Sequence, residues 1–231
     1  MVKPGNYTDN GADPAFHGMH YCDGKPTTGS VTIVDHNDGR GPIPTALFGC
    51  NGEEHTVIAK ATPTDLKNDP MLTNWTMDPH NPVMRYPEGK GGRDPATAWR
   101  APARATAAVK QQQQQQPEEE DAWYTISACG GNCSEEVGRY AAAALWSSAD
   151  FEKWDFVGTL FGMSDPNTMV ECPEFYNVTA LAGSNESGTM GGEVLHMLKA
   201  SYTHKEIAYV GRYDTTKQKL VRDEFIRPRP L

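Results

Sequence analysis

Short runs rich in valine, isoleucine, threonine, tyrosine and tryptophan recur along this chain, separated by Gly, Asp and Asn turns. Such runs are typical of β-strands. They fall into three groups, each with three or four predicted strands: 29–34, 45–49, 56–59 and a segment closing near Trp75; 93–99, 122–127, 142–148 and 151–154; and 171–176, 194–201 and 207–213. The pattern predicts an all-β chain in which one unit is repeated.

The repeat is long compared with the strands inside it. Corresponding positions at Ser30, Asp94 and Glu171 lie 64 (94 − 30) and 77 (171 − 94) residues apart. Units of about four strands at such a spacing are typical of β-propeller blades. A β-sandwich is the alternative, but its turns recur about every 8 to 12 residues without a longer period. We therefore expect an irregular lead-in over 1–28 and a partial propeller over 29–231, with units 29–92, 93–170 and 171–231.

One low-complexity segment interrupts the middle unit. Six glutamines at 111–116 are followed by Pro117 and an acidic run. This composition does not supply a packed core. Trp99 and Trp123 flank the segment as neighbouring strands of one sheet would. We therefore expect 101–121 to be an insertion loop, with a domain linker as the alternative.

Composition excludes two classes of partner. The 231 residues carry a net charge of −9, with 38% hydrophobic residues, and their mean hydropathy is −0.61. A strongly acidic chain argues against binding to nucleic acid or an anionic membrane surface. No apolar run approaches the roughly 18 to 20 residues of a membrane span. We expect neither a nucleic-acid partner nor a membrane partner.

Signals of the cellular compartment conflict. No apolar signal-peptide core follows Met1, yet five Asn-x-Ser/Thr sequons occur, at Asn6, Asn74, Asn132, Asn177 and Asn185. Such sequons accept glycans only in secretory compartments. The five cysteines, Cys22, Cys50, Cys129, Cys133 and Cys172, form an odd set that cannot pair completely within one chain. We expect a secreted or vacuolar protein.

A metal site is not expected. Cys129 and Cys133 have the spacing of half a metal site, but no partnering cluster follows them, so free thiols or one local disulfide are the favoured interpretations. His17 and His20 are the one close histidine pair, in the irregular lead-in and without an evident third ligand. We predict no metal and no cofactor.

Six ordered motifs between residues 28 and 225 resemble those of glycoside hydrolase family 32, the β-fructofuranosidases, invertases and inulinases. They are Thr28–Ile33, similar to the family's W-S-G-S-A-T strand; Asp69–Trp75 with Asn81–Val83; Arg93–Trp99, similar to its R-D-P motif; Leu145–Trp154; Glu171–Phe175, similar to its E-C-P-D-F motif; and Val194–Ser201 with Tyr209–Asp214. The resemblance implies a five-bladed β-propeller, usually followed by a β-sandwich. About three blades, the second to the fourth, are expected here.

The resemblance also implies a site. Glu171 is expected to be the general acid/base and Asp94 the transition-state stabiliser of a retaining glycosidase. Arg93, Ser30 and Cys172 are expected to bind substrate, which would be sucrose or a fructan. Two departures from the family's motif are Val170, where a tryptophan is common, and Glu174, where the family has aspartate.

The nucleophile of the family has no convincing counterpart. It is the Asp of an N-D-P-N-G motif upstream of the strand that Gly29 and Ser30 resemble. Asn68-Asp69-Pro70 imitates that motif, but Asp69 lies downstream of that strand. Asp13 lies upstream, but only 16 residues (29 − 13) before Gly29, which is too short for a blade of four strands of about five residues. Neither is predicted to be the nucleophile.

Three functions therefore follow as hypotheses. The first is hydrolysis of the fructosyl bond of sucrose or fructans with retention. The second is fructosyl transfer to another sugar. The third, from a different class, is a non-catalytic sugar-binding or vestigial protein; three blades would leave two sheet edges open, which predicts low stability.

Overall fold

The structure is a computed structural model, which describes residues 26–36, 39–51, 56–87, 91–102, 121–130, 141–163, 170–179, 194–202, 205–214 and 219–222. Within these ranges the regular elements are all β-strands, β1 to β13. The prediction of an all-β chain is confirmed. Most of the expected lead-in over 1–28 and of the expected loop over 101–121 lies outside the described residues.

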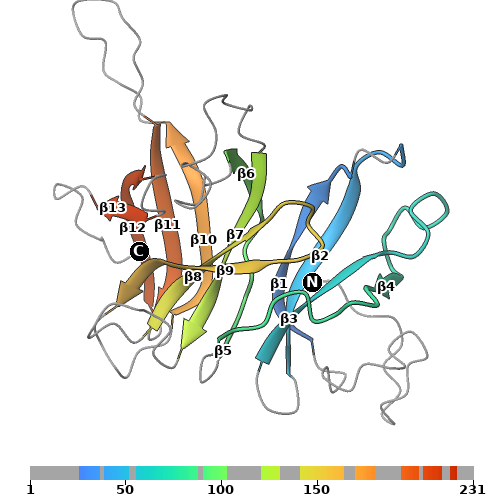
Figure 1. Ribbon diagram of the computed structural model, residues 1–231, viewed down its shortest axis with the longest axis horizontal. Helices are drawn as coiled ribbons and strands as arrows, with labels where there is room; N and C mark the ends of the chain where they lie inside the picture. Colours follow the sequence, from blue (N-terminus) through green and yellow to red (C-terminus); the bar gives the residue numbers. More distant parts are fainter. Residues whose placement is uncertain are drawn as a thin grey trace, which may run out of the picture.

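Three antiparallel sheets lie side by side, each built from strands consecutive in the chain (Figure 1). The first sheet contains β1 (Pro26–Val34), β2 (Ile43–Asn51), β3 (Thr56–Pro63) and β4 (Trp75–Met77), in that order. The middle sheet contains β5 (Gly91–Arg93), β6 (Trp99–Pro102), β7 (Asp121–Gly130), β8 (Ala141–Ser148) and β9 (Asp155–Met163). The third sheet contains β10 (Val170–Thr179), β11 (Val194–Tyr202), β12 (Lys205–Asp214) and β13 (Lys219–Arg222).

The middle sheet has an inner edge made of two short strands. Both β5 and β6 pair with β7, so that Arg93 opposes Ala128 and Trp99 opposes Tyr124. The predicted unit boundary at Arg93 therefore falls at the end of β5, which begins at Gly91. Asp94 follows directly, in the gap between the two short strands.

The strand prediction differs from the structure near the end of the middle unit and at the end of the third. Residues 151–154, expected to be a strand, form bends between β8 and β9, and β9 begins at Asp155. The carboxylate of Asp150 accepts hydrogen bonds from the backbone N–H groups of Glu152 and Lys153, which is the local bonding of a turn. In the third sheet, β13 was not predicted, and it completes four strands.

Apolar side chains fill both gaps between the sheets. Successive residues of a strand face opposite sides of the sheet, so a sheet covered on both faces carries apolar side chains throughout. On β7, Trp123 and Cys129 belong to the core shared with the first sheet, and Tyr124 and Ile126 to the core shared with the third sheet. The first core also includes Val34, Leu47, Ile58, Met84, Trp146 and Phe151, and the second includes Leu145, Phe161, Phe175, Leu198 and Tyr209.

A buried polar cluster also joins the first sheet to the middle sheet. Lys60 on β3 is only 3% exposed, and its Nζ lies 2.9 Å from Asp78 Oδ2 and forms a second ion pair with Glu152 in the turn before β9. Asn81 accepts a hydrogen bond from Lys60 N at 2.7 Å and donates one to Lys60 O at 2.8 Å. One cation therefore neutralises carboxylates from two sheets.

Replacing Lys60 by methionine is expected to lower the free energy of unfolding by about 3 kcal/mol at neutral pH, because two carboxylates lose their buried partner. Burial raises the pKa of Asp78, but hydrogen bonds from Lys60 and His80 and the charge of Lys60 lower it more, to below its ordinary value. This contribution to stability is present above the unfolded-state pKa and is lost as the pH falls through the lowered folded-state pKa. Urea unfolding should therefore show parent and variant converging in acid.

The matched control for this variant is Lys67→Met, since Lys67 is exposed. It should change the free energy of unfolding by less than about 0.5 kcal/mol. A difference between parent and Lys60→Met that persists unchanged down to the acid limit would contradict the assigned role of Asp78.

Candidate active site

All three innermost strands are irregular where they approach one another. In β1, Pro26 pairs with Cys50 and Gly29 with Phe48, so Thr27 and Thr28 together oppose the single residue Gly49. In β10, Glu171 pairs with Ser201 and Glu174 with Lys199, so Cys172 and Pro173 together oppose Ala200. The middle sheet has the gap between β5 and β6 at this place. Bulges of this kind redirect side chains and are over-represented next to active sites.

The irregularities put two non-glycine residues into left-handed backbone. The φ angle is +57° at Asp94 and +44° at Cys172. Aspartate adopts this region more readily than most residues, but cysteine rarely does, so surrounding contacts must hold the backbone of Cys172. Asp94 and Cys172 are in contact with each other between the middle and third sheets.

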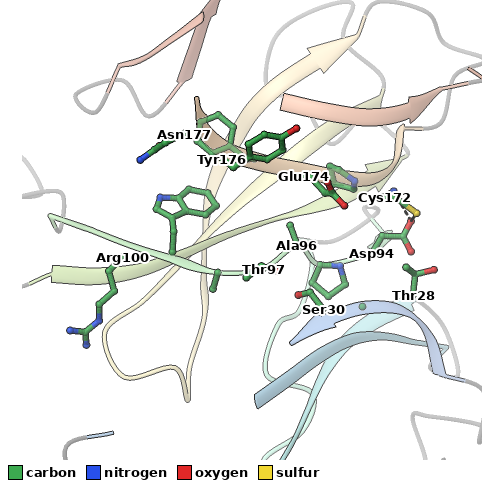
Figure 2. A pocket seen from close by; sticks show the side chains of 16 residues that line it. Thr28, Ser30, Asp94, Ala96, Thr97, Arg100, Cys172, Glu174, Tyr176 and Asn177 are labelled. Atoms are coloured by element: carbon green, nitrogen blue, oxygen red, sulfur yellow. Dashed lines mark hydrogen bonds between the residues drawn. The ribbon is translucent and has the colours of Figure 1, made fainter. Parts of the chain in front are cut away.

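Asp94 is held by the third sheet. Its side chain is 4% exposed, and its Oδ2 accepts a hydrogen bond of 3.0 Å from the backbone N–H of Cys172. The Cys172 Sγ lies 3.8 Å from the same oxygen (Figure 2). Asp94 Oδ1 is buried and has no hydrogen-bond partner in the described residues. A buried acceptor without a donor is costly unless a ligand supplies one.

Arg93 connects the two carboxylates that the motifs single out. Its Nη2 donates a hydrogen bond to Glu171 Oε1, and its Nε lies 3.6 Å from Asp94 Oδ2. The Glu171 side chain is 43% exposed, whereas Asp94 is buried. A guanidinium group can hold two carboxylates in a fixed relation because its donors form a planar fork.

A cavity of about 610 Å³ opens between the three inner strands. Figure 2 shows Asp94 and Cys172 at one end, opposite Thr28 and Ser30, with Arg100 and Asn177 toward the other end. The hydroxyl of Ser30 and that of Thr27, which lies in the bulge of the same strand, are buried without a hydrogen-bond partner among the described residues. Unpartnered hydroxyl and carboxylate oxygens beside one cavity suit a ligand rich in hydroxyl groups.

The structure brings the predicted site residues together. Asp94, Cys172 and Ser30 line the cavity. Arg93 and Glu171 are not among its lining residues; each directly precedes one that is. Glu174, the residue that replaces the family's aspartate, lines the cavity, and Val170 is buried.

Asp69 lies in a turn outside this site. Its Oδ2 accepts hydrogen bonds from Thr73 N at 2.7 Å and Asn74 N at 2.9 Å, in an exposed loop of the first sheet. Burial is the largest single effect and raises its pKa, but the hydrogen bonds from Thr73 and Asn74 together lower it more, to below its ordinary value. The carboxylate serves the turn. Asp13 lies outside the described residues.

Cysteine chemistry contributes little reactivity to the site. Burial raises the pKa of the Cys172 thiol, and the charges of Asp94 and Glu171 raise it further, so the sulfur stays protonated near neutral pH. Cys50 and Cys129 are disulfide-bonded, so Cys129 is not one of the free thiols that the sequence left open. Among the described residues no group of three or more His, Cys, Asp or Glu side chains could hold a metal ion.

Sequence reasoning missed Thr27, Thr28 and Gly49 as parts of the site. Thr28 lines the cavity beside Ser30, and Gly49 opposes the bulge. The sequence offers only a weak signal, two threonines directly before Gly29-Ser30. The remote end of the cavity, with Tyr176 and Asn177, was also missed.

None of the described elements is a helix with the length and apolar character required to cross a membrane.

Comparisons with known proteins agree on one family. The family model described as "Glycosyl hydrolases family 32 N-terminal domain" matches residues 116–228. Fructan 6-exohydrolase of Beta vulgaris is 29% identical over 208 residues, which is 85% of this chain and 30% of that protein. Acid β-fructofuranosidase of Vicia faba is 29% identical over 205 residues, or 86% of this chain and 27% of that protein.

A solved structure gives the same result for the fold. The crystal structure of fructan 1-exohydrolase IIa from Cichorium intybus matches with a TM-score of 0.65 and 25% identity, over 90% of this chain and 34% of that one. This chain therefore spans about a third of the length of the relatives it matches. The fold is therefore that of the β-propeller enzymes of this family, as the motifs predicted.

Proposed function

Because the chain belongs to glycoside hydrolase family 32, we propose that its cavity binds the fructosyl unit of sucrose or a fructan and that the site hydrolyses the fructosyl bond. Glu171 is the general acid/base, and Asp94 stabilises the transition state. Arg93, Ser30 and Cys172 position these groups and the sugar. The observation that carries the proposal is buried Asp94, whose Oδ2 is held by Cys172 N–H while Oδ1 has no partner among the described residues.

The chemistry follows from this arrangement. A sugar hydroxyl donating to Asp94 Oδ1 would satisfy a buried acceptor and lie beside a negative charge. Positive charge develops on the sugar ring in the oxocarbenium-like transition state, so that carboxylate stabilises the transition state more than the ground state. Glu171, more exposed and joined to Arg93, can give its proton to the leaving oxygen and later take one from water.

The first test is binding and turnover by the purified chain. Trp99 lines the cavity, so its fluorescence should change on titration with 1-kestose or sucrose. Ser30→Ala removes an unpartnered hydroxyl and should weaken binding about five-fold, which corresponds to one ordinary hydrogen bond. Ser147→Ala, on β8 and outside the cavity, is the control. Fructose release measured on the same samples reports hydrolysis. Failure of the chain to bind either 1-kestose or sucrose would refute the proposal.

A second candidate function is sugar binding without catalysis. The observation that favours it is Asp69, because the carboxylate of the one Asn-Asp-Pro sequence in the described residues is engaged in an exposed turn. Binding of 1-kestose without fructose release would support this candidate. The fructosyltransferase alternative predicts longer oligosaccharides at high sucrose, which product analysis of the same reaction detects.

We also propose that the protein is secreted or vacuolar. Disulfide bonds at Cys50 and Cys129 persist in oxidising compartments. The sequon residue Asn74 lies exposed in the turn before β4. A glycan at Asn74 in peptide maps of the native protein supports the proposal, whereas free thiols at both cysteines contradict it.

A further inference from the structure

Gly49 lies at the contact between the first sheet and Arg93. It is buried on β2, opposite the bulge formed by Thr27 and Thr28. A Cβ atom at this position would meet Thr27 Oγ1 well inside contact distance and would lie 3.2 Å from Arg93 Cβ and 3.5 Å from Arg93 Cα. Two of these three contacts are to the residue that joins Glu171 to Asp94.

Arg93 has little support from its own strand. It is the last residue of β5, which has three residues and pairs with β7 only through Gly91, Gly92 and Arg93. Immediately after it the backbone turns into the left-handed conformation of Asp94. The guanidinium group must still reach Glu171 on β10 and Asp94 together. The first sheet, at Gly49, therefore bounds the side of Arg93 near its Cβ.

We propose that Gly49 is a positioning residue: the absence of its side chain lets Arg93 lie against β2 and thereby sets the geometry in which Arg93 joins the two carboxylates. The inference deepens the proposed function and rests on it. A shift of Arg93 Cβ by a few tenths of an ångström is carried to the guanidinium group, where it alters the relation of Glu171 to Asp94. Small misplacements of this kind weaken both sugar binding and turnover.

Gly49→Ala is the test substitution, and Gly91→Ala is its matched control. Gly91 also lies on an inner strand, two residues before Arg93, but a Cβ atom there has nothing within 4 Å. A third variant, Thr27→Ala with Gly49→Ala, removes the oxygen that the new methyl group meets most closely. It relieves the packing conflict inside the first sheet while the crowding of Arg93 at 3.2 Å remains.

The measurement is an NMR spectrum of the full chain with ¹⁵N-labelled arginine, with the Arg93 Nε–H signal identified by its loss in Arg93→Lys. The same variants are titrated with 1-kestose. We expect Gly91→Ala to keep the parent signal and affinity. Gly49→Ala and the double variant should both displace the Arg93 signal and weaken 1-kestose binding about tenfold, although the double variant regains most of the thermal stability.

The alternative is that Gly49 only makes room for the bulge of β1 and has no effect on the position of Arg93. In that case the double variant regains the parent Arg93 signal together with its stability, and the proposal is overturned. An unchanged Arg93 signal in folded Gly49→Ala overturns it as well. If Gly49→Ala does not fold, the double variant alone decides. Failure of the parent chain to bind 1-kestose would refute the proposed function, while the Arg93 signal would still report the position of Arg93.

Discussion

Replacing Glu171 by glutamine is expected to lower the kcat for cleavage of sucrose or 1-kestose by about 10²- to 10⁴-fold, which is the usual contribution of a general acid/base. Glutamine keeps an oxygen that can accept the hydrogen bond from Arg93 Nη2, so the position of the side chain is retained. It cannot give a proton to the leaving oxygen. Fructose release under saturating substrate measures the effect, and the Kd for 1-kestose should change little.

The dependence on leaving group separates this role from a structural one. A fructosyl donor whose leaving group needs no protonation, such as β-fructofuranosyl fluoride, should lose much less of its first-step rate in Glu171→Gln. Asp155→Asn makes the same carboxylate-to-amide change at an exposed position on outer strand β9 and serves as the control. Undiminished sucrose cleavage by Glu171→Gln would contradict the assignment, and so would equal losses for both donors.

The strands of this chain were predictable where both faces of a sheet are packed. Within β8 the run 142–146 is apolar and continuous because Ala142, Ala144 and Trp146 face the first sheet while Ala143 and Leu145 face the third. Such a run can be recognised in the sequence without knowing which sheets will cover it. The same reasoning gave a wrong strand at residues 151–154. Phe151 and Trp154 are buried, but they lie in a turn held by Asp150, and burial alone does not distinguish a strand from a turn.

The candidate site was predictable only in part. Asp94 and Glu171 followed from motifs, and the structure places both next to Arg93. Motifs carry no information on which strand of another sheet closes the site. The part played by Gly49 depends on the distance between β2 and β5, two strands in different sheets. A glycine inside a strand signals a bulge or a close backbone approach, but the sequence does not say to which residue.

Because Asp94 has left-handed backbone, two substitutions at this position can separate its effect on catalysis from its effect on stability. Asparagine adopts this region more readily than most residues, so Asp94→Asn should retain the φ angle of +57° and an oxygen for Cys172 N–H. The variant loses the negative charge that lies beside Arg93 and that would stabilise the positive charge developing on the sugar. Cleavage of 1-kestose should fall about 10²- to 10³-fold, the usual effect of removing one preorganised electrostatic group, while the free energy of unfolding changes little.

Asp94→Ala should remove the same charge and also destabilise the fold. Alanine in left-handed backbone costs roughly 1 kcal/mol, and Cys172 N–H would lose its acceptor, so the free energy of unfolding should fall by about 2 kcal/mol. Urea unfolding and fructose release measured on both variants distinguish the two contributions. Equal stability of Asp94→Ala and Asp94→Asn would mean that the backbone of Asp94 is not held by its side chain. Cleavage at the parent rate by Asp94→Asn would mean that the charge, and with it the stabiliser role, lies elsewhere.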